Sequence, residues 1–305
     1  MKNAILCPGQ GAQTVGMGKD FYQTYPEARQ VYDDADKILG FSISQICFEG
    51  PDEKLQATDN AQVGIFVTTA AICQTLKSQG KFPESFDFAA GLSLGEYTAL
   101  YLAGVLSFFD AVKLVRARGE LMQAAALKEP STMLALVGAD EAAAEQICRE
   151  ASDAGVIVAA NFNTPGQIVL SGAIAACQKA AQIATQRGLR SVPLNVAGAF
   201  HSPYMKSAAE QMEKVLSGVA LAPPKMPVIS NVTARPHENV ESIRRLLVQQ
   251  IIAPVRWQQS MEYLKEQNVE SFLEPGPGRA LTGMLKKIDR RAGVKNISEV
   301  AAVNA

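Results

Sequence analysis

Residues 91–95, which spell G-L-S-L-G, constrain the fold of this chain more than any other segment. They match G-x-S-x-G, the nucleophile elbow, where a serine lies on a sharp turn from a strand into a helix and crowding by nearby backbone favours glycine. Residues 86–90 are an apolar run that predicts a buried strand, and residues 96–103 carry apolar side chains at helical spacing. The context favours an elbow with Ser93 as nucleophile over a glycine-rich turn with an incidental serine.

The base that would activate such a serine has to be sought among two histidines, His201 and His237. His201 follows the apolar run 191–196, so we expect it in a loop at the end of a strand, facing the elbow. His237 lies in the polar stretch 233–239, which is typical of an exposed surface loop. No acidic residue occurs at positions 190–208, so a backbone carbonyl or a side-chain amide is left to orient the imidazole.

A glycine-rich loop follows the first predicted strand. Residues 4–7 are apolar, and residues 8–18 contain four glycines, which would expose backbone N–H groups to a phosphate or an oxyanion. The loop is not a Walker A motif, because Asp20 follows Lys19 where serine or threonine would be required. Beside an elbow serine, the loop suggests an oxyanion hole.

Several motifs then occur in one order along nearly the whole chain. They are residues 8–13 (PGQGAQ), 91–96 (GLSLGE), 116–119 (RARG), 161–163 (NFN), 198–201 (GAFH), 247–250 (LVQQ), 254–257 (PVRW) and 274–278 (EPGPG). In these motifs the chain resembles the malonyl-CoA:acyl carrier protein transacylase family and is similar to the acyltransferase domains of polyketide synthases. A series of motifs in one order is far more specific than any single one of them.

The resemblance implies an [acyl-carrier-protein] S-malonyltransferase of fatty acid biosynthesis that works by ping-pong transfer. Ser93 would be the nucleophile, His201 the base, and the backbone N–H groups of Gln10 and Leu94 the oxyanion hole. The malonyl group would pass from malonyl-CoA to Ser93 and then to the phosphopantetheine thiol of acyl carrier protein. Malonyl-CoA is a substrate in this scheme, and neither a cofactor nor a metal is expected.

The resemblance also assigns residues around the reacting pair. Arg118 would bind the malonyl carboxylate, and Gln250 would orient the histidine and line the site. Phe200 matches the pattern of malonyl rather than methylmalonyl users. Leu92 departs from the family, which usually has histidine before the nucleophile, and this difference bears on local polarity, rate and acyl-chain tolerance.

The middle of the chain predicts a separate small lobe. Its pattern is β-α-β-β-α-β, with strands at 132–137, 156–160, 167–170 and 189–196 and helices at 140–152 and 173–186. This is the ferredoxin-like order. We therefore expect an α/β protein in which residues 126–197 form a ferredoxin-like domain inserted into a large α/β-hydrolase-like domain with a parallel sheet, made of residues 1–125 and 198–305.

The insertion begins soon after Arg118 and ends just before His201, so a cleft between the lobes would contain the site. Asn161 and Asn163 fall in residues 161–166, read as a turn between two strands. They would either reach the cleft or simply make the turn.

Composition fits a cytoplasmic enzyme. The net charge of −1 argues against nucleic acid or an anionic membrane as partner, and the five cysteines lack C-x-x-C spacing, as expected of buried thiols in a reducing compartment. Three other functions stay open: a trans-acting acyltransferase of a polyketide synthase, a serine thioesterase or esterase, and a non-catalytic protein that docks a carrier.

Overall fold

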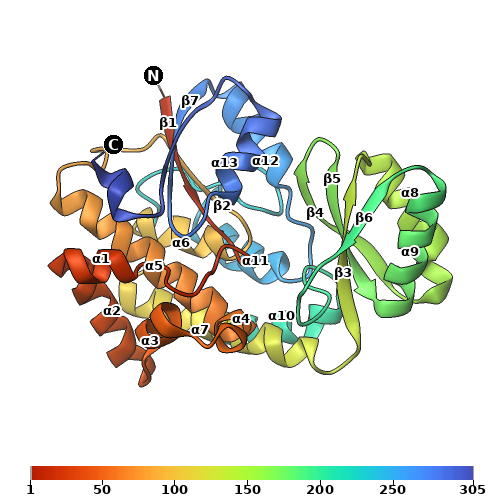
Figure 1. Cartoon of the computed structure of the whole chain (residues 1–305), viewed down its shortest axis with the longest axis horizontal. Coiled ribbons are helices and arrows are strands. Elements are labelled where there is room, and N and C mark those ends of the chain that lie inside the picture. Colours follow the sequence, from red (N-terminus) through yellow and green to blue (C-terminus); the bar gives the residue numbers. More distant parts are fainter. Residues whose placement is uncertain (1, 305) are drawn as a thin grey trace.

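A computed structural model of the chain describes residues 2–304 and contains two separate four-stranded sheets. The first sheet is parallel and has the order β2-β1-β7-β8 (Figure 1). Its strands are β1 (Lys2–Cys7), β2 (Phe88–Gly91), β7 (Val269–Pro275) and β8 (Gly293–Ile297). The carboxyl ends of β1 and β2 lie side by side, with Cys7 opposite Gly91. The two loops that leave these strands, which hold the predicted oxyanion and nucleophile residues, therefore start next to each other.

Helices surround the parallel sheet, and most of them come from the N-terminal third and the C-terminal third of the chain (Figure 1). They are α1 (Lys19–Thr24), α2 (Pro26–Leu39), α3 (Ile43–Glu49), α4 (Asp52–Gln56), α5 (Thr58–Ser78), α6 (Leu94–Leu102), α7 (Phe108–Ala126), α10 (Lys206–Ser217), α11 (Val240–Gln250), α12 (Trp257–Glu266) and α13 (Ala280–Ile288). Short 3₁₀ turns occur at Ser152–Ala154, Pro203–Met205 and Val300–Val303.

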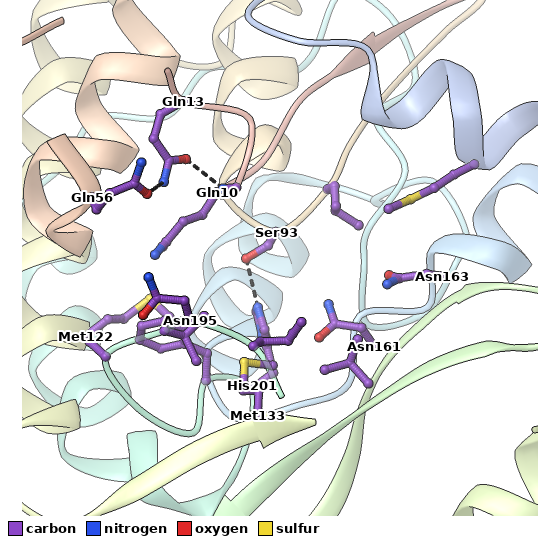
Figure 2. A pocket seen from close by; sticks show the side chains of 18 residues that line it. Gln10, Gln13, Gln56, Ser93, Met122, Met133, Asn161, Asn163, Asn195 and His201 are labelled. Atoms are coloured by element: carbon purple, nitrogen blue, oxygen red, sulfur yellow. Dashed lines mark hydrogen bonds between the residues drawn. The ribbon is translucent and has the colours of Figure 1, made fainter. Parts of the chain in front are cut away.

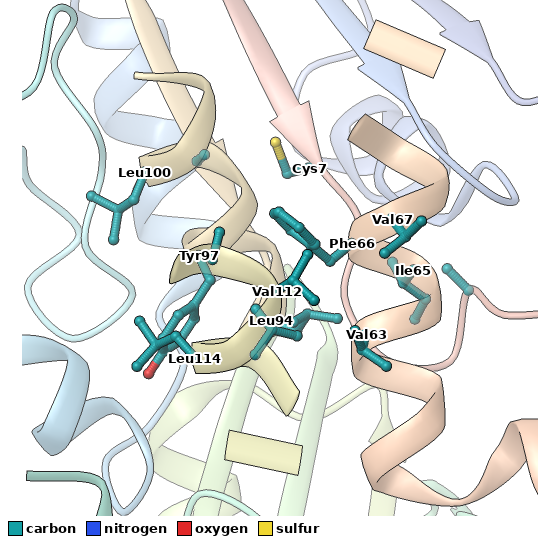
Figure 3. Close-up of a cluster of buried hydrophobic side chains, with 14 of the residues drawn as sticks. Cys7, Val63, Ile65, Phe66, Val67, Leu94, Tyr97, Leu100, Val112 and Leu114 are labelled. Atoms are coloured by element: carbon teal, nitrogen blue, oxygen red, sulfur yellow. The ribbon is translucent and has the colours of Figure 1, made fainter. Parts of the chain in front are cut away.

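Helix α5 is buried along nearly its whole length, because most of its residues are apolar or small. Figure 3 shows its side chains, among them Val63 and Phe66, in one cluster with Leu94 and Tyr97 of α6 and with Cys7 at the end of β1. This packing fixes the start of α6, and with it the turn before Leu94, against the centre of the domain.

The second sheet is antiparallel, with the order β4-β5-β3-β6. Its strands are β3 (Ser131–Val137), β4 (Ile157–Thr164), β5 (Gln167–Ala173) and β6 (Arg190–Pro193), and its helices are α8 (Glu141–Ala151) and α9 (Ile174–Gln186). The predicted order of elements is confirmed, and Asp140 caps α8 by accepting from the backbone N–H of Ala143. In Figure 1 this sheet lies to the right, with α8 and α9 on its outer face.

The predicted turn over residues 161–166 is wrong for its first part, because β4 continues to Thr164. Only Pro165 and Gly166 make the turn, with Gly166 at φ 76°. The turn residues Asn, Pro and Gly misled the prediction, since two of the asparagines belong to the strand. The last strand is also shorter than predicted and ends at Pro193.

The antiparallel sheet is bound at Asn161 to the segment that precedes α12. This residue forms a parallel bridge with Val255, the N–H of Phe162 donates to the carbonyl of Val255 (2.9 Å), and the N–H of Val255 donates to the carbonyl of Ala160 (2.8 Å). Strand β4 is thereby held against the segment that leads into α12. None of the helices between residues 2 and 304 has the length and apolar character to cross a membrane.

Candidate active site

Ser93 lies at the turn from β2 into α6, as the elbow motif predicts, with φ 52° and ψ −105°. The flanking glycines are required by space. A Cβ on Gly91 would lie 1.9 Å from the carbonyl carbon of Gly95, and a Cβ on Gly95 would lie 2.1 Å from the carbonyl oxygen of Cys7. The positive φ of a non-glycine residue is a strained conformation of the kind that is found at functional sites.

His201 is the histidine that faces the elbow. Its Nε2 lies 2.8 Å from Ser93 Oγ, and its Nδ1 lies 2.8 Å from the backbone carbonyl oxygen of Gln250 (Figure 2 shows the first contact). A carbonyl only accepts, so Nδ1 carries the proton and Nε2 of the neutral ring is free to accept from the serine hydroxyl. Of the two orienting groups that the sequence left open, the backbone carbonyl is the one present.

Burial keeps this imidazole neutral. His201 is 4% exposed, and burial together with the positive charge of Arg118 lowers its pKa to about 4, despite the opposing effect of the hydrogen bond to Gln250. At neutral pH, the ring is therefore in the form that accepts a proton.

Arg118 on α7 also contacts the serine and is completely buried. Its Nη2 donates to Ser93 Oγ (3.0 Å) and to Gln250 Oε1 (3.0 Å), while Nη1 donates to Gln62 Oε1 (2.6 Å). The guanidinium carbon also lies 5.2 Å from the centre of the Tyr97 ring. These hydrogen-bond acceptors are all uncharged, and none of the ion pairs found within residues 2–304 includes Arg118.

A buried cation of this kind is costly without an anion, and burial lowers the pKa of the guanidinium. The position beside Ser93 is therefore suited to a ligand that carries a negative charge close to its reacting atom.

The loop after β1 reaches the elbow. A Cβ on Gly9 would lie 2.2 Å from the carbonyl oxygen of Leu92, so the backbone before Gln10 passes directly against the serine turn. Leu94 is the first residue of α6, where backbone N–H groups have no partner within the helix. Gln10 thus lies on the loop that packs against the serine turn, and Leu94 follows Ser93 at the start of α6.

A cavity of about 480 Å³ opens in front of Ser93 and His201 (Figure 2). The further predicted residues Gln10, Leu92, Phe200, Asn161 and Asn163 line it. Met122, Met133, Val169 and Met284 make much of the remaining wall apolar. Asn163 Oδ1 is buried without a hydrogen-bond partner, which leaves an acceptor at the cavity.

His237 is not the exposed loop residue that its neighbours suggested. Its side chain is 0% exposed, and Nε2 donates to Glu96 Oε1 (2.8 Å). Asn231, just before the polar stretch 233–239, also binds the elbow: its Oδ1 accepts from the N–H of Ser93 (2.6 Å) and its Nδ2 donates to the carbonyl of Gly91 (2.7 Å). The polar character of residues 233–239 therefore gave no sign that His237 is buried.

The sequence analysis also missed three residues that hydrogen bond to predicted site residues: Gln62 to Arg118, Glu96 to Gln250 and Asn231 to Ser93. Glu96 directly follows the elbow motif, and that position was the one available signal. The five cysteines are free and buried, as predicted. Over residues 2–304, no three His, Cys, Asp or Glu side chains gather in a way that would hold a metal ion.

Comparison with known proteins identifies the family. The model for the acyl transferase domain matches residues 5–303. The malonyl CoA-acyl carrier protein transacylase of Bacillus subtilis (strain 168) is 41% identical over 300 residues, which cover 98% of this chain and 94% of that protein. The chain belongs to the malonyl CoA-acyl carrier protein transacylase family. The match to the family covers both sheets, since it begins in β1 and ends in the last 3₁₀ turn.

Solved structures agree with this membership. The acyl-carrier-protein S-malonyltransferase of Bartonella henselae superposes with a TM-score of 0.96 at 37% identity, covering 100% of this chain and 98% of that one. A malonyl-transacylase in complex with its type II polyketide synthase acyl-carrier protein has a TM-score of 0.96 at 34% identity, covering 100% and 98%. The parallel sheet and the separate antiparallel sheet are thus those of the transacylase family.

Proposed function

We propose that this protein transfers the malonyl group of malonyl-CoA to the phosphopantetheine thiol of acyl carrier protein. The observation that carries the proposal is the position of Ser93 Oγ, 2.8 Å from His201 Nε2 and 3.0 Å from Arg118 Nη2. A nucleophile next to a base and a buried cation suits an acyl group that ends in a carboxylate. The names of the relatives support the same substrates and class.

In the first half of the reaction, Ser93 Oγ attacks the thioester carbonyl carbon and His201 Nε2 takes the hydroxyl proton. The backbone N–H groups of Gln10 and Leu94 donate to the oxyanion of the tetrahedral intermediate. The carbon–sulfur bond then breaks, the thiolate of coenzyme A leaves with the proton from His201, and a malonyl ester remains on Ser93.

In the second half, the carrier thiol gives its proton to His201 and its sulfur attacks the ester carbonyl. The carbon–oxygen bond to Ser93 breaks, and Ser93 recovers its proton from His201. Arg118 holds the malonyl carboxylate through both halves, and Gln250 keeps the imidazole oriented through its carbonyl oxygen. The serine itself carries the acyl group, so the scheme requires neither a resident cofactor nor a metal.

Three lining residues would shape the substrate pocket. Phe200 is 6% exposed and presents an apolar wall before His201, which would leave little room for a branched acyl group. Leu92 makes the wall beside the nucleophile apolar. Asn163 Oδ1 is an acceptor for an N–H or O–H group of the substrate.

The experiment that tests the function uses labelled malonyl-CoA, with and without acyl carrier protein. Labelled carrier is expected. Free labelled malonate that forms equally fast without carrier would mean a thioesterase instead, and no label on either product would mean a carrier-docking protein. Parallel reactions with fatty acid and polyketide carriers would show which pathway is served.

We also assign the two sheets to domains. Residues 1–125 and 198–305 would form the α/β-hydrolase-like domain, and residues 126–197 the ferredoxin-like one. The strand order β4-β5-β3-β6 with antiparallel pairing supports the second assignment, and the elbow after a parallel strand supports the first.

A further inference from the structure

A buried carboxylate lies behind the site, and the proposed reaction gives it no role. Glu96 of α6 is 0% exposed, and its two oxygens accept three hydrogen bonds. Oε1 accepts from His237 Nε2 (2.8 Å), while Oε2 accepts from Gln250 Nε2 (2.7 Å) and from the N–H of Asn231 (3.0 Å). All three partners are donors, which suits a charged carboxylate that only accepts.

Gln250 connects this carboxylate to the substrate side of the site. Its Nε2 donates to Glu96 Oε2 (2.7 Å) and also to the backbone carbonyl oxygen of Ser93 (3.0 Å), and its Oε1 accepts from Arg118 Nη2 (3.0 Å). Of the two acceptors of Nε2, only Glu96 offers a carboxylate. A carboxylate only accepts and a guanidinium only donates, so a single orientation of the Gln250 amide satisfies both neighbours. If the amide turned over, it would present N–H groups to Arg118 and an oxygen to Glu96, and both contacts would become repulsive.

The charges of Glu96 and Arg118 favour the same arrangement as these hydrogen bonds. Arg118 is fully buried and hydrogen bonds only to uncharged acceptors within the described part of the chain. Burial lowers the pKa of its guanidinium, and the charge of Glu96 is one of the influences that oppose this effect. In the absence of substrate, Glu96 therefore offsets the buried cation through one intervening amide.

We propose that Glu96, held by His237, is a positioning residue for acyl selection: it fixes the Gln250 amide and thereby aims Arg118 at the acyl group on Ser93. The inference rests on the proposed function. The Gln250 amide touches Arg118, whereas the Gln250 backbone carbonyl orients His201. Loss of the Glu96 charge should thus disturb binding of the malonyl carboxylate far more than proton transfer at the serine.

The test measures acylation of Ser93 by malonyl-CoA and by acetyl-CoA, followed by mass spectrometry, in wild type and in Glu96→Gln. Glu96→Gln should lower kcat/KM for malonyl-CoA about ten- to a hundredfold, the usual effect of one charged hydrogen bond, mainly through KM. Acetylation should change less than about threefold, because no carboxylate is involved. An equal loss for both substrates, or no loss for either, overturns the proposal.

Two variants of His237 keep the test decisive if Glu96→Gln fails to fold. His237→Gln can still donate to Glu96 and should keep the malonyl preference within about threefold of wild type. His237→Leu removes the donor and should lower that preference. If the two variants have the same preference, His237 does not act through Glu96 and the proposal fails.

Glu274 provides the matched control, since it is another carboxylate at 0% exposure. It accepts from the N–H groups of Leu281 (3.0 Å) and Thr282 (2.9 Å), and none of these three residues lines the cavity. Glu274→Gln should lower the melting temperature without changing the malonyl-to-acetyl ratio, and a changed ratio would show that any buried carboxylate has this effect. If wild type itself does not transfer malonyl to carrier, the proposed function fails first, independently of these variants.

Discussion

Arg118 and Ser93 are in direct contact: the guanidinium Nη2 donates to the hydroxyl Oγ over 3.0 Å. The residue proposed to recognise the substrate thus touches the atom proposed to attack it. An acyl group bound to Ser93 must place any carboxylate within one or two bonds of the reacting carbonyl in order to meet this cation. The contact favours a malonyl group over both acetyl, which has no carboxylate, and longer dicarboxylic chains, whose charge would lie farther away.

The first prediction concerns this contact. Arg118→Ala should lower kcat/KM for malonyl-CoA by about two to three orders of magnitude, because removing one partner of a buried charge pair typically costs about 2–5 kcal/mol. It should also reduce the preference for malonyl-CoA over acetyl-CoA. Arg118→Lys should recover only part of the rate, since an ammonium cannot form two parallel hydrogen bonds with a carboxylate.

Arg116, two residues earlier on α7, is the control for this prediction. Its partly exposed side chain pairs with Asp59 (2.9 Å) and Glu120 (2.6 Å). Arg116→Ala should therefore leave the malonyl-to-acetyl ratio near that of wild type. An Arg118→Ala enzyme with an unchanged ratio would mean that the carboxylate binds elsewhere.

The second prediction concerns the covalent intermediate. Brief exposure to malonyl-CoA without carrier should add one malonyl group to the peptide that contains Ser93, detected by mass spectrometry. Ser93→Ala should show no adduct and lose transfer by roughly a thousandfold or more, as expected when a covalent nucleophile is removed. Transfer without any adduct in wild type would argue for direct attack of the carrier thiol on malonyl-CoA.

Local pattern was enough to predict that Ser93 and His201 face each other. The elbow shows in five consecutive residues, and with only two histidines in the chain the choice of His201 rested on a single adjacent strand. The resemblance to the family added Arg118 and Gln250, which spacing alone would have left as ordinary helix residues. The order of elements around the antiparallel sheet followed from periodicity and turn residues for the same local reason.

The hydrogen bonds of Glu96 and His237 next to the site could not be predicted from local pattern. Glu96 and His237 are 141 positions apart, and nothing in the polar stretch around His237 indicates that it packs beneath α6. A turn was predicted for Asn161 and Asn163 because asparagine, proline and glycine share that preference. Both residues instead belong to β4, where Asn161 pairs with Val169 of β5 and Asn163 lies at an irregularity of the pairing. Burial and long-range pairing decide these positions, and neither is visible in a short window of sequence.

The third prediction concerns acidity. The buried His201 has a pKa near 4, below the ordinary value for histidine, so the neutral base persists well below pH 6. The rate kcat/KM for malonyl transfer should therefore stay level from about pH 8 to pH 6 and fall only as the pH drops through the region around 4. An acid limb centred near 6.5, measured with protein that stays folded, would show that the imidazole is open to water.

His201→Ala should lose about two to four orders of magnitude in rate, the usual contribution of a general base. The remaining activity should lack the acid limb near pH 4 and rise with pH, since thiol and hydroxyl groups are then deprotonated by the solvent alone. A variant that kept the wild-type acid limb would place the titrating base at another residue.

The last prediction tests whether the elbow requires glycine at position 91 for steric reasons. Gly91→Ala would put a Cβ 1.9 Å from the carbonyl carbon of Gly95, so the backbone of β2 or α6 must move. Such a clash should destabilise the protein by about 3 kcal/mol or more and displace Ser93 from His201, which would lower malonylation of the serine in any protein that still folds.

Gly283→Ala is the matched change, because Gly283 lies within α13 and its added Cβ would meet nothing within 4 Å. Alanine there should raise the melting temperature slightly, as expected for a helix interior where it gains about 0.5–1 kcal/mol over glycine, with malonylation unchanged. Thermal unfolding and single-turnover malonylation of both variants distinguish the two cases. A Gly91→Ala protein that melts and reacts like wild type would show that the turn does not depend on close backbone contact.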